Sequence, residues 1–293
     1  MLNPQLWIAV FIDGSFFALL ALAFYITLVG SQFFNFAIGP YSMAAGMATS
    51  WLVVNHGWGI WLSAGVGIVV VLILGAVTDI AVIRPIQSRA GGGDLPALVA
   101  VAALLFAIQQ TAGLIFGFNN LPGEPIVSTN LFTLDGAQVE PTVVPLVVAC
   151  GVIFLLTALW IGLTRTGRLL RAVGDSPQSA RLLGFRVNRI RLIAFMLSAL
   201  IAALAGLLFA STSGNGIGFE SGLQWTLDGF LALVIGGIGW IWAPLVGGFL
   251  LAMAQIFVPY YLGGSSVDYI VLLLAVVFFA FRPQGLFAHR VRV

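Results

Sequence analysis

The sequence of 293 residues has no lysine and little charge of any kind. It contains 12 arginines and 10 aspartates or glutamates, so charged residues are 8% of the chain, against about 25% in an ordinary globular protein. Hydrophobic residues make up 60% and the mean hydropathy is +1.09. So few polar side chains cannot cover the surface of a globular fold. The composition predicts an integral membrane protein and excludes soluble enzymes, nucleic-acid-binding proteins and disordered tails.

Other absences narrow the chemistry. Without lysine the chain cannot form a P-loop, whose lysine contacts the β- and γ-phosphates of ATP. Cys150 is the only cysteine, so no disulfide can form within the chain. His56 and His289 are isolated, and we expect no metal site. No Ser/His/Asp or Cys/His arrangement suggests catalysis, so the chain is predicted not to be an enzyme.

Apolar segments of about 20 residues, enough to cross roughly 30 Å of hydrocarbon, recur along the chain. Short polar connectors separate them, and neither a soluble domain nor a periodic amphipathic stretch is expected. The pattern predicts one all-α domain over residues 1–293, a polytopic transmembrane helical bundle of about eight or nine spans. The candidate spans are Ile8–Gly30, Phe36–Val54, Trp58–Ile83, Leu95–Phe118, Thr142–Leu163, Leu192–Thr212, Leu227–Leu262 and Val267–Phe281.

Two of these segments contain helix breakers. A continuous helix over Leu227–Leu262 would be about 54 Å long, too long for one span. We expect broken or re-entrant helices at membrane depth, where irregular backbone is tolerated only beside protein or a water-filled cavity. Paired breaks indicate a transport path, and kinked packing helices with close glycine contacts are the alternative. The breakers are Asn35, Gly39 and Pro40 in the first half and Gly236, Gly237, Gly239 and Pro244 in the second.

A few polar residues lie within the apolar segments. Gln109 and Gln110 are mid-span, where buried amides either join helices or line a path. Asp79 lies about one turn before Arg84, which favours an ion pair at the inner membrane interface. Three further acids fall near predicted span ends and favour interfacial carboxylates or helix caps: Asp13, Asp228 and Asp268.

The arginines form three clusters, which orient the chain because basic residues in short loops mark the cytoplasmic side. The number of spans between clusters places all three on one face, and the arginine-free loop Asn119–Pro141 on the other. We therefore predict a multi-pass membrane protein with a cytoplasmic C-terminus. The clusters are Arg84 and Arg89, seven arginines from Arg165 to Arg191, and Arg282, Arg290 and Arg292.

The loop Thr164–Arg191 has more arginine than orientation requires. Ser176 can cap a helix that begins at Pro177, and Gly184 suits its C-terminal end. Ala180, Leu182 and Leu183 would give this helix an apolar side within a basic rim. Such a helix suits docking into a groove of a soluble partner. The alternative is a helix at the lipid headgroups, with arginines on anionic lipid.

The stretch GRLLRAVGDSPQSARLLGFRVNRIRLIAFMLSALIAALAGLL resembles the cytoplasmic-loop signature of permease subunits of bacterial branched-chain amino acid ABC importers. Four further motifs resemble the same family in the same order: DGSFFALLALAFYITLVG with FNFAIGPYSMAAG, IRPIQSR, ALVIGGIGWIWAPLVGGFLLAMAQ and FRPQGLF. The pattern is more similar to the LivH-type than to the LivM-type permease. It departs from the family at Pro40 and at Gln255, where an acidic residue is usual.

The resemblance implies an ABC-importer permease that forms half of the pathway for branched-chain or related small amino acids. Its implied partners are two ATPase subunits that bind the ATP, a second permease (a LivM-like paralogue or a second copy), an extracytoplasmic substrate-binding protein and membrane lipid, without nucleic acid or any cofactor of its own. Some family members transport urea and short amides instead, and this is one alternative. Outside the family, the alternatives are a gradient-driven secondary transporter and a membrane scaffold.

Two sets of residues follow from this interpretation. Residues 164–191 would be the cytoplasmic coupling loop, which partner ATPases push. Its expected coupling residues are Arg171, Asp175, Ser176, Pro177, Ala180, Arg181, Leu183 and Gly184. The candidates for the translocation path are Asn35, Gly39, Gln109, Gln110, Gly236, Gly237, Gly239 and Pro244.

Overall fold

The structure, a computed structural model, describes residues 4–89, 94–123, 125, 132–134, 137–139, 142–212, 216–262 and 286–287. The predicted span Val267–Phe281, with Asp268, lies outside the described residues. The elements in chain order are α1 (Pro4–Ser31), α2 (Ile38–His56), α3 (Ile60–Val77), the π-helix η1 (Thr78–Ile83), α4 (Arg84–Arg89), α5 (Asp94–Phe116), β1 (Phe132–Leu134), β2 (Ala137–Val139), α6 (Val143–Leu163), α7 (Arg165–Asp175), α8 (Pro177–Leu182), α9 (Val187–Thr212), α10 (Ser221–Gly236) and α11 (Ala243–Leu262).

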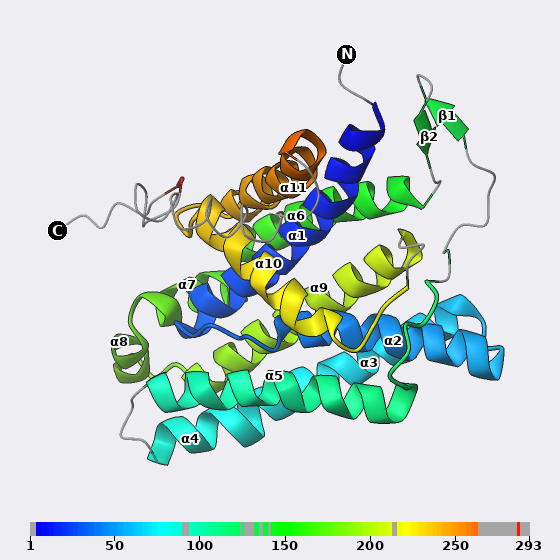
Figure 1. The fold of residues 1–293 in the computed structure, drawn as a ribbon. Helices are drawn as coiled ribbons and strands as arrows, with labels where there is room; N and C mark the ends of the chain where they lie inside the picture. Colours follow the sequence, from blue (N-terminus) through cyan, green and yellow to red (C-terminus); the bar gives the residue numbers. More distant parts are fainter. Residues whose placement is uncertain are drawn as a thin grey trace.

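The described chain is a bundle of long apolar helices with one short antiparallel hairpin, β1–β2, beside it (Figure 1). Six helical stretches in these residues are long and apolar enough to cross a membrane, whereas α10 has only 16 residues and α2, with 19, is less apolar. The all-α, multi-pass membrane fold predicted from the sequence is therefore confirmed. The six are Pro4–Ser31, Ile60–Ile86, Pro96–Phe116, Val143–Leu163, Val187–Thr212 and Ala243–Tyr261.

Helix α1 lies at the centre of the bundle. In its most apolar window 61% of the residues are buried, and in that of α9 56%, against about 30% in α3, α5, α6 and α11. Helix α1 packs on α6, α7, α9, α10 and α11. A helix that is apolar on all sides is expected in such a position, and the outer helices present their remaining apolar side chains to lipid.

The bundle has two distinguishable ends. Helices α4, α7 and α8 lie at one end, at the left of Figure 1, which we call the Arg-rich end. At the other end the loops after α5 and α9 join, because the backbones of Leu121 and Ile217 exchange two hydrogen bonds of 3.0 and 2.8 Å. Ser50 of α2 donates a hydrogen bond to the carbonyl oxygen of Pro122 in the same place.

The first predicted break is present. Helix α1 ends at Ser31, residues 32–37 are not α-helical, and α2 begins at Ile38. Gln32 adopts a left-handed backbone conformation with φ of 54°, the single positive φ at a non-glycine residue in the described chain. Helix α2 then runs only to the end opposite the Arg-rich end, so it crosses part of the bundle.

The second break is also present. Residues 237–242 connect α10 and α11 as a turn, with Gly237 at φ of 91°. This turn lines a cavity together with α7 on the Arg-rich side of the bundle. Helix α10 begins at Ser221, six residues before the predicted span, and is about 24 Å long when it reaches Gly236.

The loop Thr164–Arg191 contains more helix than expected. Helix α7 occupies Arg165–Asp175, and α9 begins at Val187, five residues before the predicted span. Helix α7 is amphipathic, with Gly167, Leu170 and Val173 buried and its arginines toward solvent. The expectation that the chain has no amphipathic stretch was therefore wrong.

The packing of α2 on α9 generates a test of the fold. A Cβ at Gly206 of α9 would overlap the carbonyl oxygen of Ser42, whose hydroxyl donates a 2.7 Å hydrogen bond to Ala202. We expect Gly206→Ala to destabilise the protein by about 1–3 kcal/mol, since the added methyl overpacks two backbones. Thermal unfolding of the purified protein in detergent measures the change.

The control is Gly151→Ala in α6, where none of the described atoms lies within 4 Å of the added Cβ. This change should be neutral or stabilise by up to about 1 kcal/mol, from helix propensity alone. Equal shifts in the two variants would contradict the close α2–α9 packing.

Candidate functional site

The unwound segment before α2 is held by side chains inside the bundle. Asn35 is fully buried, and its Oδ1 accepts a 3.1 Å hydrogen bond from the Ala37 amide. The Ile38 amide donates to the Asn35 carbonyl oxygen, and Thr226 of α10 donates to the Phe36 carbonyl oxygen at 3.1 Å. Backbone groups without water need such partners. The Asn35 Nδ2 has none in the structure and is a donor available inside the bundle.

Three of the path candidates meet at this break. A Cβ at Gly39 would overlap the Gly222 carbonyl oxygen, so α2 and α10 touch through their backbones. Gln109 of α5 is buried, and its Nε2 donates to the carbonyl oxygens of Phe219 and Glu220 at 3.2 and 3.0 Å. Asn35, Gly39 and Gln109 thus converge with the start of α10, and we call this group of contacts the α2 junction.

The other path candidates lie elsewhere. Gln110 is exposed on the outer side of α5. Gly237 and Gly239 lie in the α10–α11 turn at the Arg-rich end, and Gly236 and Pro244 flank it at the ends of α10 and α11. Gly236 follows Thr226 by ten positions in α10, which is about 15 Å along the helix. The eight predicted path residues therefore form two separate groups, with Gln110 in neither.

Helix α8 has the boundaries that its sequence predicts, because both ends are capped. The Ser176 Oγ accepts a 3.2 Å hydrogen bond from the Ser179 amide, and Pro177 takes the first helical position. At the C-terminus Gly184 has φ of 80°, and its amide donates to the Arg181 carbonyl oxygen. The Phe185 amide donates to the Ala180 carbonyl oxygen, which completes a Schellman motif.

The apolar residues of α8 face two directions. Ala180 is only 3% exposed and packs against its own chain, so it is not part of an outer surface. Leu182 and Leu183 are 90% and 73% exposed and project outward, and Arg181 beside them is also exposed. We call Leu182 and Leu183 the leucine pair. An exposed apolar pair on a capped helix is typical of a contact surface.

Helix α7 connects this segment to the centre of the bundle. A Cβ at Gly174 would overlap the carbonyl oxygen of Val29, so α7 lies directly on the last turns of α1. The Gln32 side chain donates a hydrogen bond to the Gly174 carbonyl oxygen. Arg171 donates to the Ile161 carbonyl oxygen at 2.8 Å. Helix α7 is therefore fixed to the end of α1 immediately before the chain unwinds.

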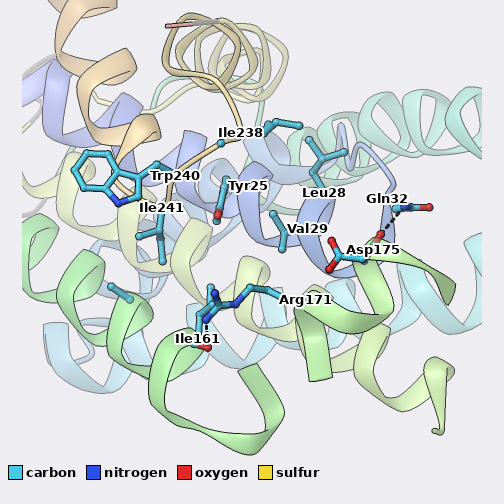
Figure 2. A pocket seen from close by; sticks show the side chains of 13 residues that line it. Tyr25, Leu28, Val29, Gln32, Ile161, Arg171, Asp175, Ile238, Trp240 and Ile241 are labelled. Carbon is cyan, nitrogen blue, oxygen red and sulfur yellow. Dashed lines mark hydrogen bonds between the residues drawn. The ribbon is translucent and has the colours of Figure 1, made fainter. Parts of the chain in front are cut away.

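A cavity of about 620 Å³ opens beside these contacts (Figure 2). It is lined by the end of α1, by α6 and α7, and by the α10–α11 turn. Of the predicted coupling residues, Arg171 and Asp175 line it, and of the path candidates, Gly239 does. We call it the Arg171 cavity.

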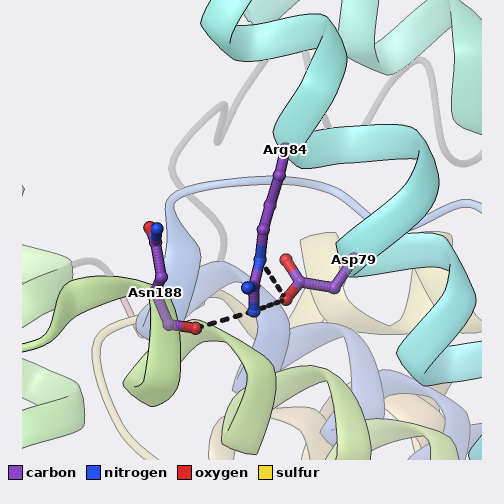
Figure 3. Close-up of polar contacts among 3 residues, drawn as sticks. All are labelled: Asp79, Arg84 and Asn188. Carbon is purple, nitrogen blue, oxygen red and sulfur yellow. Dashed lines mark hydrogen bonds and ion pairs between the residues drawn. The ribbon is translucent and has the colours of Figure 1, made fainter.

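A buried ion pair lies near the same end (Figure 3). Asp79 of η1 has no exposed side-chain surface, and the Arg84 Nε donates to its Oδ2 at 2.9 Å. The Arg84 Nη2 also donates to the Asn188 carbonyl oxygen at 2.9 Å, which ties α4 to the first turn of α9. The predicted Asp79–Arg84 pair is confirmed.

One polar contact was missed at the sequence level. Asp228 is 7% exposed in the middle of α10, and the Gln255 side chain of α11 donates to its Oδ1 at 2.8 Å. The sequence prediction placed Asp228 at a span end because the apolar run begins at Leu227. A second polar residue, Gln255, lies within the next apolar helix. It is the sequence signal that Asp228 has a partner inside the bundle and does not mark the start of a span. No group of three or more metal-ligating side chains occurs among the described residues.

These features define a class: a multi-pass membrane protein with a broken helix inside the bundle and a capped helix outside it. The sequence matches the family described as "Branched-chain amino acid transport system / permease component" over residues 6–281. The chain belongs to this family of transport permeases, which are not enzymes.

Individual relatives agree with this assignment. The high-affinity branched-chain amino acid transport system permease protein BraD of Pseudomonas aeruginosa is 36% identical over 138 residues, which cover 46% of this chain and 43% of that protein. The corresponding permease protein LivH of Escherichia coli (strain K12) is 25% identical over 267 residues, 88% of this chain and 82% of that protein.

The fold is also similar to a solved structure, PsaBC from Streptococcus pneumoniae in complex with Fab. The TM-score is 0.54 at 14% identity, with 96% of this chain and 91% of that chain covered. At this identity the likeness establishes the fold alone.

The α2 junction yields a prediction with an internal control. Gln109→Leu removes both hydrogen bonds to the α10 start, and we expect a loss of about 0.6–1.7 kcal/mol, the range for such contacts in membranes. Gln110→Leu makes the same chemical change one position along α5, on the exposed side, and should leave stability unchanged or slightly raised. Unfolding midpoints in detergent compare the two, and equal effects would show that Gln109 does not hold α10.

Proposed function

We propose that this chain is the permease subunit of an ABC importer and forms half of the translocation pathway for branched-chain or related small amino acids. The observation that carries the proposal is the family match along residues 6–281. Partner ATPases bind and hydrolyse ATP, since this chain has no lysine for a P-loop. A second permease and an extracytoplasmic binding protein complete the importer.

In this proposal the Arg-rich end faces the cytoplasm, in agreement with the preference of basic loops for that side. The C-terminus then also lies there, in the inner membrane of a bacterium. Helix α8 docks on an ATPase through the leucine pair, and exposed Arg181 contributes charge at its edge. Ala180, being buried, holds α8 on the permease instead of contacting the ATPase.

Movement of α8 reaches the middle of the membrane through short contacts. Helix α7 follows α8 because Ser176 is shared by the end of one and the cap of the other. The Gly174–Val29 and Gln32–Gly174 contacts pass the movement to the end of α1. The next residues are the unwound segment and the α2 junction. There the Asn35 amide and the broken backbone offer polar groups to a passing amino acid.

Uptake into proteoliposomes tests the function. The purified complex of this chain with its partners should accumulate L-leucine only when ATP is present on the ATPase side and the binding protein on the other. Vanadate should stop it, because hydrolysis drives the cycle. The alternative of a gradient-driven transporter rests on Asp228, an acid inside the bundle. Uptake by this chain alone under an ion gradient would establish that alternative and exclude the importer.

Docking through the leucine pair has a separate test. We expect the double variant Leu182→Asp/Leu183→Asp to weaken ATPase association at least about 30-fold, the effect of losing an interface anchor worth about 2 kcal/mol. Co-purification and titration of the ATPase with permease in nanodiscs measure this. Gln178→Asp adds charge to the same helix at an exposed position and should change association little. Unchanged binding by the double variant would place docking elsewhere.

A further inference from the structure

The Arg171 cavity is lined by two opposite charges that do not pair with each other. Arg171 and Asp175 are four residues apart on one face of α7, the spacing at which arginine and aspartate usually interact. The two α7 side chains form no ion pair with each other in the described structure, and both line the cavity. Figure 2 shows them entering from α7, opposite Ile238 and Trp240. The cavity therefore offers a cation and a carboxylate at separate points.

The other walls are mostly apolar. Leu28 and Val29 come from α1, Ile161 from α6, and Ile238 and Trp240 from the α10–α11 turn. Ile238 and Trp240 are 47% and 51% exposed, so the turn presents apolar surface at the cavity. A volume of about 620 Å³ is within the range of small-molecule sites, roughly 300–1,000 Å³. Apolar walls with a few convergent polar groups are the usual composition of such sites.

We propose that the Arg171 cavity binds a zwitterionic aliphatic amino acid from the Arg-rich side of the membrane. The Nη2 of Arg171 donates a hydrogen bond to the Ile161 carbonyl oxygen. The other N–H groups of the guanidinium can donate to the ligand carboxylate. Asp175 accepts from the ligand ammonium, and the aliphatic side chain packs against the leucine, valine and isoleucine walls. A simple anion such as a lipid phosphate fits less well, since Asp175 repels it.

The position of the cavity gives the ligand an effect on transport. A ligand here contacts α1, α7 and the α10–α11 turn together, and α7 is the element that passes movement from α8 to α1. A bound amino acid stabilises the present arrangement of these three elements and opposes its change. The site is thus inhibitory: amino acid that accumulates on the ATPase side slows further import. This role rests on the proposed function, whereas the binding chemistry does not.

Equilibrium binding of radiolabelled L-leucine tests the site, with the permease–ATPase complex in nanodiscs and without the binding protein. Leucine should bind at least about tenfold more tightly than 4-methylpentanoate, which lacks the ammonium, and than 3-methylbutylamine, which lacks the carboxylate. Asp175→Asn should weaken leucine binding about tenfold and should strengthen 4-methylpentanoate binding, because the carboxylate that repels this anion is gone. This selective loss separates a lost contact from a disturbed fold.

A cavity-filling variant avoids the charged residues altogether. Ala158→Phe on α6 places a ring in the cavity and should abolish leucine binding. Leu159→Phe, at the next and exposed position outside the cavity lining, is the matched control and should bind normally. Equal affinity for leucine and its two fragments, or normal leucine binding by Ala158→Phe, would overturn the site, as would displacement of leucine by anionic lipid alone.

The inhibitory role is measured separately in proteoliposomes. L-leucine on the ATPase side should reduce the rate of ATP-driven uptake several-fold, and Ala158→Phe should remove this inhibition without changing uptake when that side holds no leucine. An uptake rate that does not change when leucine is added on the ATPase side would refute the inhibitory role. If the complex imports no leucine at all, the proposed function fails, and the binding series still decides whether the site exists.

Discussion

The structure depends on one constraint: backbone that unwinds inside a membrane bundle must find hydrogen-bond partners in protein. In residues 32–37 the Asn35 side chain accepts a hydrogen bond from the backbone, and the Thr226 hydroxyl donates one to it. Thr226 can reach the Phe36 carbonyl oxygen only because Gly39 lets α2 and α10 approach to backbone contact. Gln109 then holds the first residues before α10 in place. The break therefore sets where α2 begins and how closely α2 packs on α10.

Contacts lead from both sides of this break to the helices that flank α8. On its α1 side, Val29 and Gln32 contact α7 at Gly174. On its α2 side, the Tyr41 hydroxyl donates to Thr78 of η1 at 2.6 Å. Thr78 adjoins Asp79, whose partner Arg84 bonds the first turn of α9. Helices α7 and α9 flank α8, so both sides of the break are connected to the segment that would meet an ATPase.

Local signals in the sequence were enough for some elements and not for others. Ser176, Pro177 and Gly184 predicted α8 to within one residue, because capping depends on neighbours along the chain. Asn35 and Pro40 likewise located the first break. The start of α10 was predicted six residues too late because Asp228 was interpreted as a span end. Its partner Gln255 is a tertiary contact that an apolar run does not reveal. The arginines of α7 were interpreted as orientation and as the basic rim of a docking loop, and the apolar residues between them were not recognised as one face of a helix.

Helices α7 and α8 at the Arg-rich end differ in what they leave exposed, and this difference assigns them different tasks. The apolar residues Leu170 and Val173 of α7 pack against the rest of the chain and are 0% and 1% exposed. The larger apolar side chains of α7 are thus turned inward, which suits a helix that transmits movement or holds a ligand. Helix α8 buries Ala180 and leaves the leucine pair outside. In the proposed importer, docking therefore belongs to α8 and its C-cap Leu183, and a ligand under α7 can regulate transport without touching the leucine pair.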